Sequence, residues 1–227
     1  MFPSSGPQQP QLTDHRSGRQ TLVSVVGPVV AVTCALFLPW LLGHESVTRD
    51  ALRFTLPVWT FTRQELLAGR FPAWDPTRLS GNPHAANLQT GVFYPLNWLL
   101  LPLDPDLAIR VSVVVHVALG GVLLTLFARS LRLSNAASVL AGLAYVTGAF
   151  VSSRVYASHI QILQTVAWAP LLLMTARGLA LDGSTRWAGG LAMATALSFV
   201  AGYPVYAAYC LMAAGLLFLG SVWRSPR

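Results

Sequence analysis

The chain has 227 residues, of which 54% are hydrophobic and only 10% are charged. A soluble globular domain carries about 25% charged residues, so this composition excludes an ordinary soluble protein. The formal net charge is +7, but every basic residue is an arginine, and most stand singly at the ends of apolar segments rather than in a patch suited to nucleic acid. The sequence therefore predicts an all-α polytopic membrane protein with no nucleic-acid partner.

The chain divides into a short tail and a membrane domain. Residues 1–19 are rich in Pro, Gln, Ser and Gly, which predicts a disordered cytoplasmic tail. The membrane domain, 20–227, opens with the apolar run 21–43. A signal-peptide core has roughly 7–15 residues, so this longer run is expected to stay in the protein as the first span.

Further apolar runs of spanning length follow, each near the roughly 17–25 residues that a helix needs to cross a bilayer. Asp104 and Ser134 are expected to cap two of these helices. The run from Trp187 to Trp223 is too long for one crossing, and Gly202-Tyr203-Pro204 divides it. About six spans are therefore expected, at 21–43, 107–128, 134–153, 158–176, 187–202 and 204–222.

The placement of charge predicts the orientation. Arginines gather at one set of helix ends, which puts both termini in the cytoplasm and the chain in the plasma (inner) membrane. The connection 44–106 then becomes one large extracytoplasmic loop. It holds most of the acidic residues of the chain: Glu45, Asp50, Glu65, Asp75, Asp104 and Asp106.

This loop is expected to be ordered and to touch the membrane. Apolar side chains in Arg49–Gly69 follow a helical spacing, which predicts an interfacial helix with a kink at Pro57. Residues 71–98 are dense in Pro, Gly and Asn and predict an ordered but irregular loop. The segment 92–103 is too short to span and is expected to dip into the interface.

The order of several motifs in and after the loop resembles the bacterial YfhO-like membrane protein family. The motifs are Asp50, Pro57, Glu65-Leu66, Gly69, Phe71-Pro72, Trp74-Asp75-Pro76, Gly81-Asn82-Pro83, Asn87, Gln89, Phe93-Tyr94-Pro95, His159, Ala167-Trp168-Ala169-Pro170 and Gly202-Tyr203-Pro204. The resemblance implies the N-terminal module of a GT-C-fold glycosyltransferase. Family chains have about twice as many spans, so a C-terminal half or a partner subunit is expected.

The resemblance also implies an activity and a site. The expected enzyme moves a sugar from a polyprenyl-phosphate donor to a cell-envelope glycan or lipid acceptor outside the cytoplasm. Asp50 matches the catalytic base of GT-C enzymes, with Glu65 and Asp75 as further candidate acids. The residues expected to bind substrate are Arg49, Arg53, Asn87, Gln89, Tyr94, Arg154 and His159. No cofactor is indicated beyond a divalent metal ion, for which Glu65 or Asp75 could be a ligand.

Each of these residues also has a simpler interpretation. Asp50 could form a surface ion pair with Arg49 or Arg53, and Asp75-Pro76 is a common turn pair. Arg154 could bind a lipid phosphate or extend to headgroups with no specific role. His116 is expected to bond between helices, and His84 to lie in a solvated turn. The alternative function is a noncatalytic membrane subunit, or a flippase or transporter for lipid-linked sugars.

Overall fold

A computed structural model describes residues 14–43 and 49–224. The described residues form helices, turns and irregular loops, with no strand among them. In chain order the helices are α1 (Asp14–Leu41), the π-helical turn η1 (Ala51–Thr55), α2 (Leu56–Leu67), the 3₁₀ turn η2 (Leu88–Thr90), α3 (Pro95–Leu99), α4 (Pro105–Ser130), α5 (Asn135–Thr147), α6 (Ala149–Ala157), α7 (Ile160–Val166), α8 (Ala169–Asp182), α9 (Thr185–Val200) and α10 (Pro204–Arg224).

Five helical segments are long and apolar enough to cross a membrane: Leu22–Leu41, Pro105–Ser130, Asn135–Ala157, Ile160–Asp182 and Pro204–Arg224. They correspond to five of the expected spans. The remaining one is α9, which has 16 residues and a length of about 24 Å at 1.5 Å per residue. This is shorter than a hydrocarbon core of roughly 30 Å.

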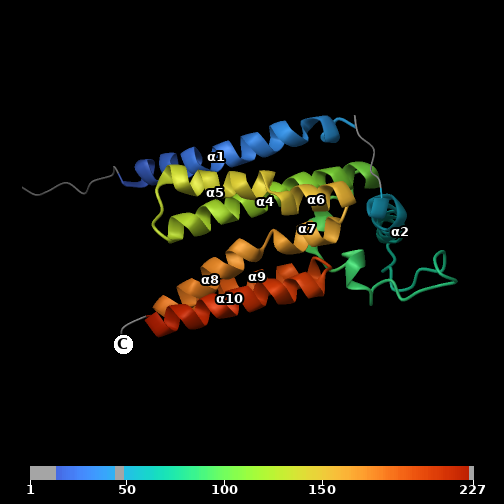
Figure 1. Ribbon diagram of the computed structural model, residues 1–227. Helices are drawn as coiled ribbons and strands as arrows, with labels where there is room; N and C mark the ends of the chain where they lie inside the picture. Colours follow the sequence, from blue (N-terminus) through green and yellow to red (C-terminus); the bar gives the residue numbers. More distant parts are fainter. Residues whose placement is uncertain (1–13, 44–48, 225–227) are drawn as a thin grey trace, which may run out of the picture.

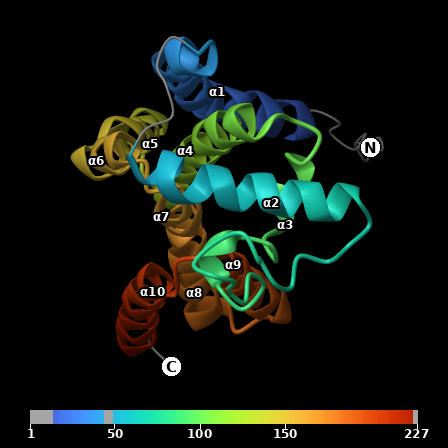
Figure 2. The same cartoon turned by 90° about the vertical axis from the view of Figure 1, so that its right-hand side faces the viewer.

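The long helices form a bundle with two packed groups (Figures 1 and 2). In one group α1, α4 and α5 pack together, and in the other α8, α9 and α10 do so, with α4 also contacting α7 and α8. Glycines allow the closest approach: a Cβ added to Gly142 would lie 2.1 Å from the Thr125 hydroxyl oxygen. Such close packing at small residues is typical of membrane helices, where the hydrophobic effect does not drive helices together.

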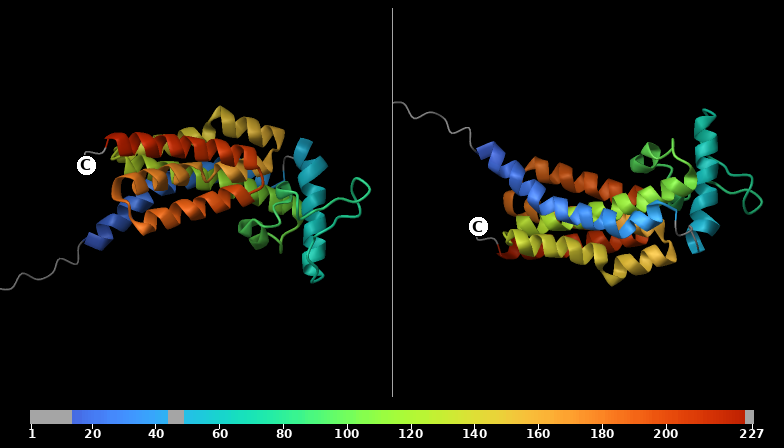
Figure 3. Two further views of the ribbon diagram at one scale, coloured as in Figure 1. Left: turned by 90° about the horizontal axis from the view of Figure 1, so that it is seen from below. Right: turned by 90° about the horizontal axis from the view of Figure 1, so that it is seen from above.

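Two of the apolar segments are broken rather than straight. The third breaks at Gly148, where α5 ends and α6 begins at a different angle (Figure 3), and a Cβ there would lie 2.7 Å from the carbonyl oxygen of Ala144. The fourth breaks between α7 and α8 at Ala167 and Trp168. Between the third and fourth segments, the chain turns from α6 to α7 at Ser158, which has φ 60°.

One end of the bundle is covered by the segment from η1 to α3. Figures 2 and 3 show α2 lying across the helix ends, with the irregular loop that follows it projecting away from the bundle. Pro57 lies in the first turn of α2, where a missing N–H costs little. A kink was expected at Pro57, but the change in helix geometry lies before it, in the π-helical turn η1.

The predicted tail is partly wrong. Residues 1–13 lie outside the described residues, but α1 begins at Asp14 and so includes residues 14–19. This stretch holds no proline and has Arg16 and Arg19, which are good helix formers, so the helix extends past its apolar part. The predicted caps are confirmed: Asp104 Oδ1 accepts from the Asp106 N–H at 3.0 Å, and Ser134 Oγ from the Ala137 N–H at 3.2 Å.

Candidate functional site

Three of the predicted site residues meet at the end of the bundle that α2 covers. Asp50 immediately precedes η1, while Arg154 lies on α6 and His159 in the turn before α7. The Asp50 Oδ2 atom lies 3.0 Å from His159 Nε2, and His159 Nδ1 lies 3.1 Å from Arg154 Nη1. We call these three residues the Asp50 cluster. The Asp50 cluster joins the start of the loop to α6 and α7, which lie about a hundred residues later in the sequence.

The hydrogen bonds in the Asp50 cluster run in one order. Arginine can only donate hydrogen bonds, so Nδ1 of His159 accepts from Arg154 Nη1. The Nε2 atom of the same ring then donates a hydrogen bond to the Asp50 carboxylate. The side chain of Asp50 is 63% exposed, so the carboxylate is held at one oxygen and remains open to solvent.

Two aromatic rings of α6, those of Tyr156 and Phe150, lie against arginines at this site. Arg49 donates to the Tyr156 hydroxyl and lies over its ring, with the guanidinium carbon 4.1 Å from the ring centre. Arg154 lies 5.4 Å from the centre of the Phe150 ring. Arg53 is exposed in η1, one turn after Asp50. The site therefore combines one exposed carboxylate with three guanidinium groups.

A buried link holds η1 against α7 beside this site. Gln161 donates from Nε2 to the Thr55 hydroxyl at 3.3 Å, and both side chains are buried. Ser158, in the left-handed region, turns the chain between α6 and α7 so that His159 faces Asp50. A left-handed non-glycine residue costs free energy and persists where its surroundings hold it.

Glu65 lies well away from the Asp50 cluster. It is 15 positions further along η1 and α2, about 22 Å at the helical rise. Both of its carboxylate oxygens accept from Arg70, at 2.6 and 2.8 Å. This two-bond ion pair keeps the pKa of Glu65 below its ordinary value. The arrangement suits a surface ion pair more than a catalytic acid.

Asp75 is buried in the loop that follows α2. Its Oδ1 atom accepts from the N–H of Thr77 at 2.8 Å and from the Thr77 hydroxyl at 2.6 Å, which forms the expected turn. Its backbone also pairs with that of Asn82. The Oδ2 atom is buried and has no partner among the described residues. Asp75 is thus enclosed, and a substrate could reach it only if the loop opened.

His84 is buried as well, so the expectation of a solvated turn residue is wrong. Its side chain packs edge-on against Phe61 of α2, with 5.0 Å between ring centres. Thr62 Oγ1 donates to the Val58 carbonyl and therefore accepts from His84 Nε2, which lies 2.8 Å away. The turn sequence around His84 does not reveal this burial, because α2 supplies the covering residues.

The burial of His84 makes the loop sensitive to acid. Burial lowers its pKa, against a smaller opposing effect of Asp75, and Arg78 lowers it further. The unfolded chain, with a histidine pKa near 6.5, then binds the proton more readily than the folded chain. Stability is full above about pH 6.5 and falls as the pH drops below it.

We therefore expect the thermal unfolding midpoint to fall between pH 7.5 and pH 5.5, and to fall less in His84→Gln. Glutamine keeps an N–H donor for Thr62 but does not titrate. Circular dichroism of the detergent-extracted protein measures both midpoints. An equal fall in the two proteins would assign the acid sensitivity to another group.

Tyr94 is completely buried, in a polar network between the loop and the bundle. Its hydroxyl accepts from Trp168 Nε1 at 2.9 Å and donates to His116 Nε2 at 2.7 Å, while His116 Nδ1 donates to the Ser112 carbonyl at 2.6 Å. Burial raises the pKa of Tyr94 above its ordinary value. The expectation that His116 bonds another span is wrong, because its partners are its own helix and the loop.

Asn87 and Gln89 lie together at η2, beside the start of α10 and apart from the Asp50 cluster. Asn87 caps η2 by accepting from the Gln89 N–H at 3.0 Å. The two residues line an open hollow shared with Gly202–Val205 at the start of α10. Gly202 has φ 111°, and a Cβ there would lie 2.7 Å from the Leu88 carbonyl oxygen, so only glycine allows this approach.

The His, Cys, Asp and Glu side chains within residues 14–43 and 49–224 are scattered rather than clustered. No group of three or more His, Cys, Asp or Glu residues in that part of the chain could hold a metal ion. Cys34 and Cys210 are free thiols, and Cys34 is exposed on the surface of the bundle. Cys34 therefore lies on the outer surface of the apolar segment Leu22–Leu41.

The comparisons with known proteins leave the chain without an assigned family. No family model, no curated protein and no solved structure matches it. The residues that sequence reasoning missed are Phe150 and Tyr156, because aromatic side chains in an apolar segment are ordinary lipid-facing residues until a cation is seen beside them.

Proposed function

We propose that the chain is a membrane glycosyltransferase, or the N-terminal part of one, with its site at the Asp50 cluster. The donor is a sugar linked to polyprenyl phosphate, and the acceptor is a hydroxyl of a cell-envelope glycan or lipid. The observation that carries this proposal is an exposed carboxylate held at one oxygen by the imidazole of His159, which is itself held by a guanidinium. The resemblance to YfhO-like proteins adds the donor class.

In the proposed reaction, Asp50 acts as the general base. An acceptor hydroxyl gives its proton to the Asp50 carboxylate while its oxygen forms a bond to the anomeric carbon of the sugar. The bond from that carbon to the phosphate oxygen breaks, and the phosphate leaves with the electron pair. A positioned carboxylate in this role contributes typically about 10²–10⁴-fold. His159 orients the carboxylate by donating to Oδ2.

The three arginines around the carboxylate suit the other half of this reaction. Charge builds up on the departing phosphate, and guanidinium groups bind phosphate oxygens in pairs. Arg154 and Arg53 come from different segments, so a phosphate between them would join the loop to α6. Arg49 is already held by Tyr156, which limits its reach.

The proposal includes the orientation expected from the sequence, with η1 and α2 on the extracytoplasmic side and both termini in the cytoplasm. We expect a cysteine at position 79 to react with an impermeant maleimide added to intact cells, since Leu79 is 86% exposed at the tip of the loop. A cysteine at exposed position 132, beyond the other end of α4, should be protected until the cells are opened. Both variants need Cys34 and Cys210 replaced by serine. Labelling of position 132 in intact cells would overturn the orientation.

Reconstitution tests the proposed activity. The purified chain in lipid nanodiscs is supplied with polyprenyl-phosphate-linked sugars and a cell-envelope lipid extract. We expect one polyprenyl phosphate to be released for each sugar transferred, with and without a divalent metal ion. Binding of the donor with no release, in this chain and in the presence of its co-purifying partners, would instead favour the noncatalytic subunit or flippase.

A further inference from the structure

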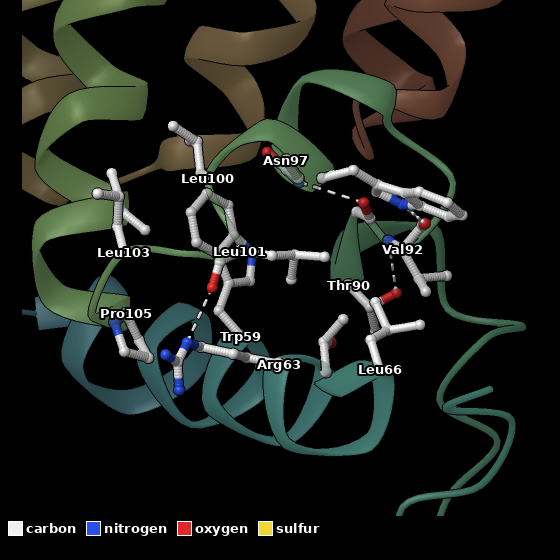
Figure 4. A pocket seen from close by; sticks show the side chains of 14 residues that line it. Trp59, Arg63, Leu66, Thr90, Val92, Asn97, Leu100, Leu101, Leu103 and Pro105 are labelled. Atoms are coloured by element: carbon white, nitrogen blue, oxygen red, sulfur yellow. Dashed lines mark hydrogen bonds between the residues drawn. The ribbon is translucent and has the colours of Figure 1, made fainter. Parts of the chain in front are cut away.

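A second site lies between α2 and the segment that leads into α4. Figure 4 shows a half-open pocket with Trp59, Arg63 and Leu66 of α2 on one side. The opposite side is formed mainly by apolar residues: Val92, Leu100, Leu101, Leu103, Pro105 and Ala108. None of these residues belongs to the Asp50 cluster, and the pocket is therefore separate from the proposed catalytic site.

The pocket combines an apolar lining with a buried hydrogen-bond donor that has no partner among the described residues. The indole N–H of Trp59 is buried and has no hydrogen-bond partner among the described residues, although the side chain is only 8% exposed. Such a donor loses free energy unless a ligand or water accepts its hydrogen bond. A ligand with an oxygen acceptor above an apolar chain would satisfy both the indole and the lining.

Arg63 supplies a positive charge at the same place. Its Nε atom donates to the Leu101 carbonyl at 2.9 Å, which fixes the guanidinium beside the pocket. In the described part of the chain Arg63 forms no ion pair. The nearby carboxylates have other roles, since Asp104 caps α4 and Asp106 pairs with Arg110 at 2.7 Å. The charge of Arg63 is therefore left for an anion.

The position of the pocket indicates the source of that anion. Pro105 and Ala108 line the pocket and belong to the first turns of α4, one of the segments able to cross a membrane. The pocket thus lies at the level where a bilayer changes from acyl chains to headgroups. Trp98 also lines it, with its indole donating to the Val92 carbonyl at 2.7 Å, and tryptophan is enriched at this level.

We propose that this pocket binds one anionic phospholipid. An acyl chain packs against the leucines and Ala108, an ester or phosphate oxygen accepts from the Trp59 indole, and the headgroup phosphate binds the guanidinium of Arg63. The bound lipid joins α2 to the start of α4 and so helps to hold α2 across the bundle. The inference does not depend on sugar transfer, and it concerns a lipid that remains bound rather than a substrate.

Native mass spectrometry of the full chain tests the proposal by titration with phosphatidylglycerol or with phosphatidylcholine of the same acyl chains. We expect one phosphatidylglycerol to be retained, at least tenfold more tightly than phosphatidylcholine. Arg63→Gln should weaken that binding at least tenfold. The matched control is Arg78→Gln, which removes the same charge from a residue that packs on Phe54 outside the pocket and should bind as the parent does.

Trp59→Phe keeps an aromatic ring of similar shape and removes only the N–H, so it provides a second test if Arg63→Gln folds poorly. We expect it to weaken phosphatidylglycerol binding severalfold. Equal loss in the Arg63 and Arg78 variants would show general attraction of anionic lipid and overturn the site. Equal retention of the two lipids by the parent, or unchanged binding in both pocket variants, would also overturn it.

Discussion

Asp50→Asn is expected to lower sugar transfer at least about a hundredfold, because asparagine cannot take a proton from the acceptor hydroxyl. Its amide oxygen can still accept from His159 Nε2, so the loop should keep its place against α7. Initial rates of transfer in nanodiscs measure the effect. The expression level and thermal unfolding midpoint of the variant should stay near those of the parent.

Asp182→Asn is the matched control for this substitution. Asp182 is also a carboxylate in a surface ion pair, 3.2 Å from Arg186, but it lies at the other end of α8. Its replacement should leave transfer unchanged. Full activity in Asp50→Asn would remove Asp50 from the mechanism. Glu65, with both oxygens bound to Arg70, and Asp75, buried in its turn, are poorly placed to take over the role.

Arg154→Gln should weaken binding of the polyprenyl-phosphate donor about 10–100-fold, the range expected when a charge-assisted hydrogen bond of about 1.5–3 kcal/mol is lost. Titration of the donor with the parent and the variant in nanodiscs measures this effect.

Arg132→Gln provides the comparison for Arg154→Gln, because Arg132 is an exposed arginine at the opposite end of the bundle. Donor affinity should remain at the parent value in this variant. If Arg154→Gln binds the donor as tightly as Arg132→Gln does, Arg154 has only the role of an arginine that reaches the lipid headgroups.

The helices of this chain could be predicted well from its sequence, because spans depend on local runs of apolar residues and on local caps. Asp104 and Ser134 begin α4 and α5 as expected, and Gly202-Tyr203-Pro204 separates α9 from α10. The predicted span 187–202 and the observed α9 both have 16 residues. A helix of this length is shorter than a hydrocarbon core of roughly 30 Å, so an apolar run bounded by breaks is not by itself a span.

The interior of the loop was the least predictable part. Asp75 and His84 stand in turn sequences that usually face solvent, and both are buried because α2 folds over the segment that follows it. Contacts of this kind join residues that are distant in sequence, and no local pattern encodes them. The proximity of Arg154 and His159 to the loop was predictable from topology. The contact of His159 with Asp50, and that of Arg154 with His159, came only from the geometry of the α6–α7 turn.

Photocrosslinking tests the central claim, that the Asp50 cluster is the site of the donor phosphate. A polyprenyl phosphate carrying a diazirine close to the phosphate is bound to the parent chain in nanodiscs, irradiated, and located by peptide mass spectrometry. We predict adducts in the segments 49–53 and 150–159, reduced by unlabelled polyprenyl phosphate and weakened in Arg154→Gln. Adducts spread over the lipid-facing helices, unchanged by the competitor, would contradict the account.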